Sequence, residues 1–115
     1  VFDTNTHALL ANIPVGTLPQ EFSLSLKKPY LFVTCTEDII NGQRGSVAVI
    51  DYNQLTLIKK IHTGTQPHGV AVNDDKDVVY VANRNLTQID MNTLEMVPGY
   101  KCELGVNPYS VAYKK

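Results

Sequence analysis

The stretch that decides the fold is VIDYNQLTLIKKIHTGTQPHGVAVNDDKDVVYVAN, residues 49–83, because the chain contains it more than once. Residues 1–35 align with it without a gap at a constant offset of 48 positions (49 − 1), and ten of the 35 aligned pairs are identical. Unrelated segments of ordinary composition would share roughly two identities over this length. The alignment therefore indicates a duplicated structural unit. The identical residues are, in the first copy, Val1, Asp3, Asn5, Leu9, Ile13, Gly16, Thr17, Pro19, Lys28 and Val33.

A third, shorter copy follows the second. Residues 89–96 (IDMNTLEM) match residues 50–57, and residues 105–112 (GVNPYSVA) match residues 64–71. Cys102 falls in an apparent insertion between these two matching segments. Self-similarity with a period near 40 residues is typical of solenoids and propellers.

Each copy consists of short apolar runs bounded by turn residues. In the second copy these runs are residues 46–51, 57–62, 69–73 and 78–83, and they are rich in Val, Ile and Tyr. This length and composition predict strands, and no segment has the apolar spacing of a helix. Residues 78–82 (VVYVA) are apolar at nearly every position, which predicts a strand covered on both faces. The sequence predicts an all-β chain.

The residues between these runs are equally regular. Asp51 and Asn53 have counterparts in the other copies, and short polar side chains of this kind hold tight turns by accepting hydrogen bonds from backbone N–H groups nearby. Gly64 and Pro67 also recur, and they end one strand and redirect the chain into the next. Each period therefore contains four antiparallel strands. Four-stranded sheets that cover one another's apolar faces make a β-propeller, and each sheet is then called a blade.

At this point the repeat resembles a known family, the YVTN-type β-propeller proteins. Their typical run is V-I-D, then I-x-V-G-x-x-P-x-G-V-A-V, then Y-V-x-N, and almost the whole chain follows it. The first copy departs from it, with LFVTC (residues 31–35) in place of Y-V-x-N and Gln20-Glu21 in place of His-Gly. Tyr109-Ser110 makes the same replacement in the third copy. The resemblance implies a propeller fragment built of four-stranded antiparallel blades.

The repeat predicts how the single domain is divided. We expect residues 1–20 to end one blade, residues 21–66 and 67–106 to form two blades, and residues 107–115 to start another. A propeller closes with typically four to eight blades, so we expect partners in the form of further blades of the same polypeptide or other protein subunits. The segment from Asn83 to Asp90 is shorter than the matching segment from Cys35 to Asp51. This difference predicts either a very tight hairpin or a loop missing near residues 84–87, and we favour the missing loop.

Composition excludes several partners. The ten basic and eleven acidic residues give a net charge of −1 and are scattered, which argues against a nucleic-acid surface. No apolar run approaches the roughly 20 residues that cross a bilayer. Cys35 and Cys102 lie too far apart for a zinc motif, and we expect buried or idle free thiols in preference to a disulfide.

The sequence contains no motif for catalysis or metal binding. His68 precedes a strand predicted to be innermost and could point to a central channel, although a turn and packing role is the favoured interpretation. The acidic pair Glu37-Asp38 lacks the spacing of a calcium loop and is expected in a solvated turn. We therefore predict no catalytic residue, metal site or cofactor. Binding is expected at loops of one rim, residues 36–45 and 84–86, with candidate residues Glu37, Asp38, Gln43, Arg44, His68 and Arg84.

Three functions remain open. The favoured hypothesis is a non-catalytic propeller that acts as a binding or interaction platform. The alternative is the scaffold portion of a propeller enzyme, either a cofactor-dependent oxidoreductase or a lactone hydrolase, whose active-site residues lie mostly outside this chain. A third possibility is a structural subunit that completes its ring inside a larger assembly. The family resemblance alone implies a bacterial or archaeal protein of the periplasm or cell surface.

Overall fold

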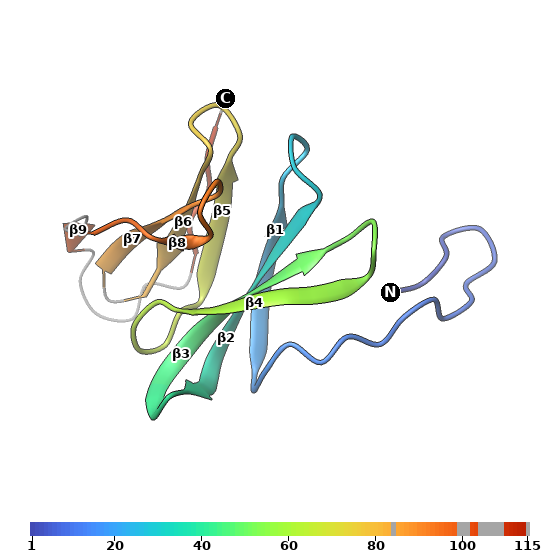
Figure 1. Cartoon of the computed structure of the whole chain (residues 1–115), viewed down its shortest axis with the longest axis horizontal. Helices are drawn as coiled ribbons and strands as arrows, with labels where there is room; N and C mark the ends of the chain where they lie inside the picture. The colour runs from blue at the N-terminus through green and yellow to red at the C-terminus, as the bar shows by residue number, and fades with distance from the viewer. Residues whose placement is uncertain (84, 99–101, 104–109, 115) are drawn as a thin grey trace.

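The chain folds into two antiparallel β-sheets (Figure 1). The computed structural model describes residues 1–83, 85–98, 102–103 and 110–114, and these residues contain strands but no helix, so the all-β prediction is confirmed. The first sheet has its strands in chain order, each antiparallel to the next. They are β1 (Pro19–Leu24), β2 (Tyr30–Ile40), β3 (Gln43–Asp51) and β4 (Thr56–His62).

The second sheet repeats this order, except that its fourth position holds two short strands. Asp90 near the end of β7 pairs with Glu95 in β8, whereas Leu86 near the start of β7 pairs with Cys102 in β9. The outer position of this sheet is therefore interrupted, at the place where the third sequence copy has its insertion. The strands are β5 (Gly69–Asn73), β6 (Val78–Ala82), β7 (Asn85–Asp90), β8 (Glu95–Met96) and β9 (Cys102–Glu103).

The two sheets pair their strands in the same register. Phe22 lies opposite Val33 and Leu24 opposite Leu31 in the first sheet. At positions 48 residues later, Val70 lies opposite Val81 and Val72 opposite Val79. The repeated sequence thus folds into a repeated sheet, and both sheets have the form of a propeller blade. Two such sheets do not close a ring.

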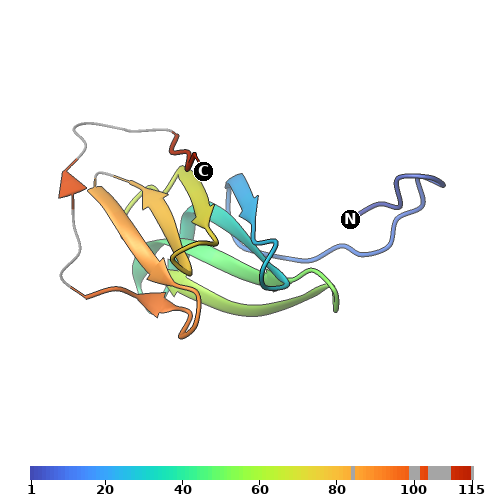
Figure 2. The same cartoon turned by 90° about the horizontal axis from the view of Figure 1, so that it is seen from above.

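The main hydrophobic core lies between the two sheets, which stand side by side in both views (Figures 1 and 2). Residues alternate between the two faces of a strand, so every second residue of β3 and of β6 points into this core. Since both contributing faces are apolar, the interface excludes water as a domain interior does. Its buried members are Phe32, Val47, Val49 and Ile61 from the first sheet and Val70, Val79, Val81, Ile89 and Met91 from the second or the turn that follows it.

The aspartate turns adopt one conformation in all three copies. The Asp51 Oδ1 atom accepts hydrogen bonds from the N–H groups of Asn53 and Gln54, both at 2.9 Å. Asp3 and Asp90 accept the corresponding bonds from the residues two and three positions later. Four positions after each aspartate the backbone enters the left-handed region, with φ between 55° and 61° at His7, Leu55 and Leu94. The turn predicted from the sequence is therefore confirmed.

The hairpin between β2 and β3 corrects the expectation of a loop over residues 36–45. Strand β2 continues to Ile40 and β3 begins at Gln43, so only Asn41 and Gly42 form the turn. Both have positive φ, 51° and 77°, as a two-residue hairpin turn requires. Asn-Gly is a strong sequence signal for such a turn, and the apolar pattern on either side is broken by charged residues, which obscures it.

Strands β6 and β7 are joined by a tight hairpin. Ala82 pairs with Leu86, and the N–H group of Asn83 donates to the backbone oxygen of Asn85 at 3.0 Å. Asn83 also accepts a hydrogen bond on its side chain from the N–H group of Asn85. Arg84 lies outside the described residues. That residues are missing from this hairpin stays a prediction.

Residues 1–18 form an arm on the side of the first sheet that faces away from the second (Figures 1 and 2). Phe2 and Leu9 form an isolated antiparallel bridge within it. The arm returns to the sheet at Ile13 and Val15, which pack against a second, smaller cluster of buried residues. That cluster consists of Val33, Cys35, Ala48 and Ile50.

Candidate functional site

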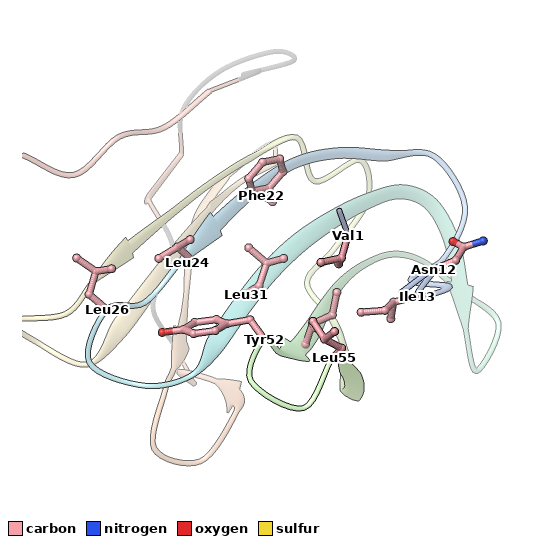
Figure 3. A pocket seen from close by; sticks show the side chains of 10 residues that line it. Val1, Asn12, Ile13, Phe22, Leu24, Leu26, Leu31, Tyr52 and Leu55 are labelled. Carbon is pink, nitrogen blue, oxygen red and sulfur yellow. The ribbon is translucent and has the colours of Figure 1, made fainter. Parts of the chain in front are cut away.

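An apolar groove lies on the face of the first sheet that is turned away from the second. It has a volume of about 670 Å³, and its lining is almost wholly apolar. The sheet contributes Phe22, Leu24 and Leu31, and the arm contributes Val1 and Ile13. Figure 3 shows Leu24 and Leu26 toward one end of the groove, Leu31 in its middle, and Val1, Ile13 and Leu55 toward the other end.

Alternation along β1 places these side chains in the groove. Ser23 faces the second sheet, where its Oγ atom accepts a hydrogen bond from the N–H group of Val72 at 3.2 Å. Its neighbours Phe22 and Leu24 consequently point to the opposite face. They are 70% and 46% exposed, and Leu26 after the strand is 79% exposed. A contiguous apolar surface of this kind in a folded domain is typical of an interaction site.

Four of the predicted site residues lie on the hairpin of β2 and β3. Gln43 pairs with Ile40 and Arg44 with Ile39 across the strands, and both Gln43 and Arg44 are exposed. Arg44 Nη1 lies 3.3 Å from the Glu37 Oε2 atom. The hairpin therefore brings Glu37, Gln43 and Arg44 to one projecting edge, where their heads remain accessible.

Asp38 differs from its neighbours because it is buried, with 6% of its surface exposed. Its carboxylate accepts hydrogen bonds from the Ser46 hydroxyl at 2.8 Å, from Lys60 Nζ at 3.2 Å and from the backbone N–H group of Thr17 at 3.3 Å. Burial alone would raise the pKa of Asp38, but the hydrogen bonds and the positive charge of Lys60 outweigh burial and lower it. The solvated turn expected here is wrong for Asp38, whose contacts anchor the arm to the sheet.

His68 lies apart from that hairpin, immediately before β5. Its backbone N–H group donates to the oxygen of Ala82 at 3.0 Å, and its backbone oxygen accepts a hydrogen bond from the Thr34 hydroxyl at 2.7 Å. The backbone of His68 thus joins the two sheets, and its side chain is partly exposed. Arg84 lies outside the described residues, so the structure does not relate it to the other candidates.

A second, polar hollow of about 340 Å³ lies where the end of β4 meets the turn between β6 and β7. Its lining includes the Thr63 hydroxyl, which is buried and makes no hydrogen bond to the described residues. The Asn83 side chain donates to the backbone oxygen of Thr63. Sequence reasoning missed this hollow, because Asn83 was interpreted only as the end of a strand and Thr63 was not singled out. No local pattern relates these two residues, which lie 20 positions apart in the chain.

Cys35 and the His, Asp and Glu side chains are the groups of the described residues that could act as nucleophiles or metal ligands. Cys35 carries a free thiol and is fully buried; burial and the nearby Asp38 carboxylate raise its pKa, which favours the unreactive thiol form. In the part of the chain that the structure describes, no group of three or more His, Cys, Asp or Glu side chains is arranged to hold a metal ion. The same part contains no helix with the length and hydropathy of a membrane crossing.

Comparison with known proteins gives a likeness in fold. No family model matches the chain, and no curated protein matches it in sequence. Among solved structures, the chain is similar to a chain of the hydrazine synthase of Kuenenia stuttgartiensis, with a TM-score of 0.69 and 18% sequence identity. The match covers 97% of this chain but only 29% of that chain. At this identity the likeness extends to the fold alone, and it supports the β-propeller-like scaffold.

Proposed function

We propose that this chain is part of a non-catalytic β-propeller of the YVTN type that serves as a binding platform for other proteins. The three sequence copies support the family assignment, and the two sheets of matching register support the propeller-like scaffold. Residues 1–20, 21–66, 67–106 and 107–115 are then the parts of successive blades. The matching hydrazine synthase chain is several times longer than this one, so larger assemblies can carry a scaffold of this size as one portion.

The observation that carries the proposal is the apolar groove of the first sheet. Phe22, Leu24 and Leu26 each leave nearly half or more of their surface in contact with solvent around it. Burying apolar surface contributes about 25 cal/mol per Å², so covering these side chains would favour association with a protein surface. Gln43 and Arg44 are exposed and Glu37 is partly exposed on the hairpin of the same sheet, and these three side chains supply candidates for specific recognition.

The proposal is tested by isolating the tagged protein from the cells that make it, with two variants that differ only in which exposed apolar residue is replaced. Phe22→Ser removes a groove side chain, whereas Ile39→Ser removes one that is 63% exposed and outside the groove. We expect a stoichiometric protein partner to remain associated with the Ile39→Ser variant and to be lost from the Phe22→Ser variant. If the groove is instead covered by blades of the same polypeptide, those blades should stay protected from protease in Ile39→Ser and lose that protection in Phe22→Ser. A monodisperse, unassociated protein whose behaviour is the same in both variants would contradict the platform.

The alternative function is the scaffold portion of an enzyme, and the similarity to a protein named hydrazine synthase is the observation that favours it. In that case the natural protein would contain a metal or a coloured cofactor held by residues outside this chain. Visible absorbance and elemental analysis of the natural protein decide between the two functions. A featureless spectrum without stoichiometric metal favours the platform, and an absorbing or metal-containing protein favours the enzyme.

Periplasmic or cell-surface localisation is proposed from the family resemblance. Fractionation of the cells that make the protein tests it, and recovery with the cytoplasmic fraction would contradict it. The intact mass of the natural polypeptide tests whether further blades and further loop residues near 84–87 belong to the same chain. A mass of roughly 35 to 40 kDa would correspond to seven or eight repeats of typical length.

A further inference from the structure

The polar hollow at the end of β4 has the size and the lining of a site for a small polar molecule. Its volume of about 340 Å³ lies near the lower end of the roughly 300–1,000 Å³ that ligand pockets occupy. Two segments that are distant in the chain meet there. The end of β4 and the residues after it contribute His62, Thr63 and Thr65, and the second sheet contributes Asn85, Thr87 and Met96.

Thr63 provides the observation that points to a ligand. It is buried, with 4% of its surface exposed, and its hydroxyl lines the hollow without a hydrogen bond to any described residue. Its backbone oxygen, by contrast, accepts a hydrogen bond from the Asn83 side chain. Leaving a buried hydroxyl unpaired destabilises a protein, so almost every such group in a folded domain has a partner. A molecule bound in the hollow would supply that partner.

His62 and Thr87 offer hydrogen-bond acceptors to the same molecule. The His62 Nδ1 atom lies 2.9 Å from the backbone oxygen of Gly45. Since a carbonyl oxygen only accepts, Nδ1 carries the proton, and the Nε2 atom of the neutral ring can accept. The Thr87 hydroxyl donates to the backbone oxygen of Val81 at 3.5 Å, which leaves its own oxygen able to accept. The ligand should therefore donate hydrogen bonds and also accept one from Thr63.

The lining favours a neutral ligand. Its described residues include no Asp, Glu, Lys or Arg. A charged ligand would lose hydration in the hollow without gaining an opposite charge, which is unfavourable. A hydroxyl group both donates and accepts, so it can pair with Thr63 in either direction. Several hydroxyls on one carbon ring match these polar groups, and the C–H groups of the ring can pack against the adaptable Met96 side chain.

We propose that this hollow binds a neutral polyhydroxy molecule, the size of one sugar ring, with the Thr63 hydroxyl as its central hydrogen-bond partner. A free monosaccharide and the terminal sugar of a longer glycan share this chemistry. The site is distinct from the apolar groove, since the two have no lining residue in common. Sugar binding and the proposed association with other proteins can therefore fail independently.

The test measures sugar binding to the natural protein by saturation-transfer NMR and by titration calorimetry. The probes are D-glucose, D-galactose and D-mannose, together with linear tetrasaccharides of the same sugars. We expect at least one of the three monosaccharide types to bind. Comparable affinity for a monosaccharide and its tetrasaccharide would identify a free sugar as sufficient, and much tighter binding of the tetrasaccharide would identify a glycan end.

Two substitutions of the same kind separate binding from folding. Thr63→Val removes the unpaired hydroxyl, so we expect a sugar affinity lower by about fivefold or more, with the midpoint of urea unfolding unchanged or higher. Thr34→Val is the matched control, because Thr34 is fully buried outside the hollow and its hydroxyl donates to the backbone oxygen of His68 at 2.7 Å. It should lower the urea midpoint and leave the sugar affinity unchanged.

A third variant tests the hollow without touching the buried hydroxyl. Thr65 is exposed at the edge of the hollow, so Thr65→Trp should fill the space and weaken sugar binding by a similar factor. The urea midpoint of this variant should stay close to that of the natural protein.

Three results would overturn the proposal. The first is the absence of binding by every sugar, which would leave ordered water as the partner of the Thr63 hydroxyl. The second is sugar binding that is equal in the natural protein and in the Thr63→Val and Thr65→Trp variants, which would place the sugar elsewhere. The third is binding of N-acetylglycine amide or of inorganic phosphate in place of the sugars, which would make a peptide segment or an anion the occupant. None of these results affects the platform, which is tested at Phe22.

Discussion

At the scale of single residues, Asp38 shows how a side chain that reads as surface in the sequence becomes interior in the fold. The sequence context Glu37-Asp38 is polar, and spacing alone predicts that it is solvated. The structure instead places Gly16 of the arm against the carboxylate: a Cβ atom on Gly16 would lie 2.6 Å from the Asp38 Cγ atom. Contacts between residues so far apart in the chain depend on the path of the arm, which no local pattern encodes.

Asp38→Asn is therefore expected to destabilise the protein in a pH-dependent way. Its carboxylate has a lowered pKa in the folded chain, so it contributes stability above the unfolded-state pKa of about 3.9, and that contribution is lost as pH falls through the folded-state pKa. At pH 7 we expect a loss of about 1–3 kcal/mol, as for other disrupted buried hydrogen-bond networks, shrinking below about pH 4. Urea unfolding at several pH values measures it, with the exposed Glu95→Gln as control. A penalty that is the same at pH 3 and pH 7 would contradict the assignment.

At the scale of elements, the sequence predicted most strands because the repeat shows the same pattern several times. The runs at 57–62, 69–73 and 78–83 agree with β4, β5 and β6 to within about one residue at either end. The hairpin of β2 and β3 was not predicted, because the polar residues between Thr36 and Gly45 have no counterpart in the second copy. The groove was not predicted either: its residues are apolar like those of the core, and only the absence of a covering sheet distinguishes them.

Two glycines of that hairpin should respond very differently to alanine. Gly42 has φ of +77° and open space where a Cβ atom would be, so Gly42→Ala should cost only the backbone strain of about 1 kcal/mol. A Cβ atom on Gly45 would lie 2.0 Å from the backbone oxygen of Gly64, so Gly45→Ala should cost more than about 3 kcal/mol. Chemical unfolding of both variants measures the difference. Equal losses would show that the start of β3 does not pack against the Gly64 turn.

At the scale of the whole molecule, the two faces of the first sheet are unequal. Toward the second sheet, the β1–β2 turn adds polar links to the core: the Ser25 hydroxyl donates to Asp74, and Lys27 Nζ lies 2.7 Å from Asp77 Oδ1. Toward the groove, position 26 is an exposed leucine where the second sheet has Asp74. One face is therefore a completed interface, and the other is an apolar surface only half covered by the arm.

Because one face is covered and the other is exposed, substitutions at equivalent positions of the two sheets should differ in how much they lower the free energy of unfolding. Val70→Ala should lower the free energy of unfolding by about 1.5 kcal/mol, because two buried methyl groups are lost at about 0.8 kcal/mol each. Phe22→Ala, the equivalent change in the first sheet, should alter it by no more than about 0.5 kcal/mol, because the ring is 70% exposed. Urea unfolding of the two variants measures both values. A large cost for Phe22→Ala in the chain alone would show that this face is already closed, and the groove would lose its role as a docking site.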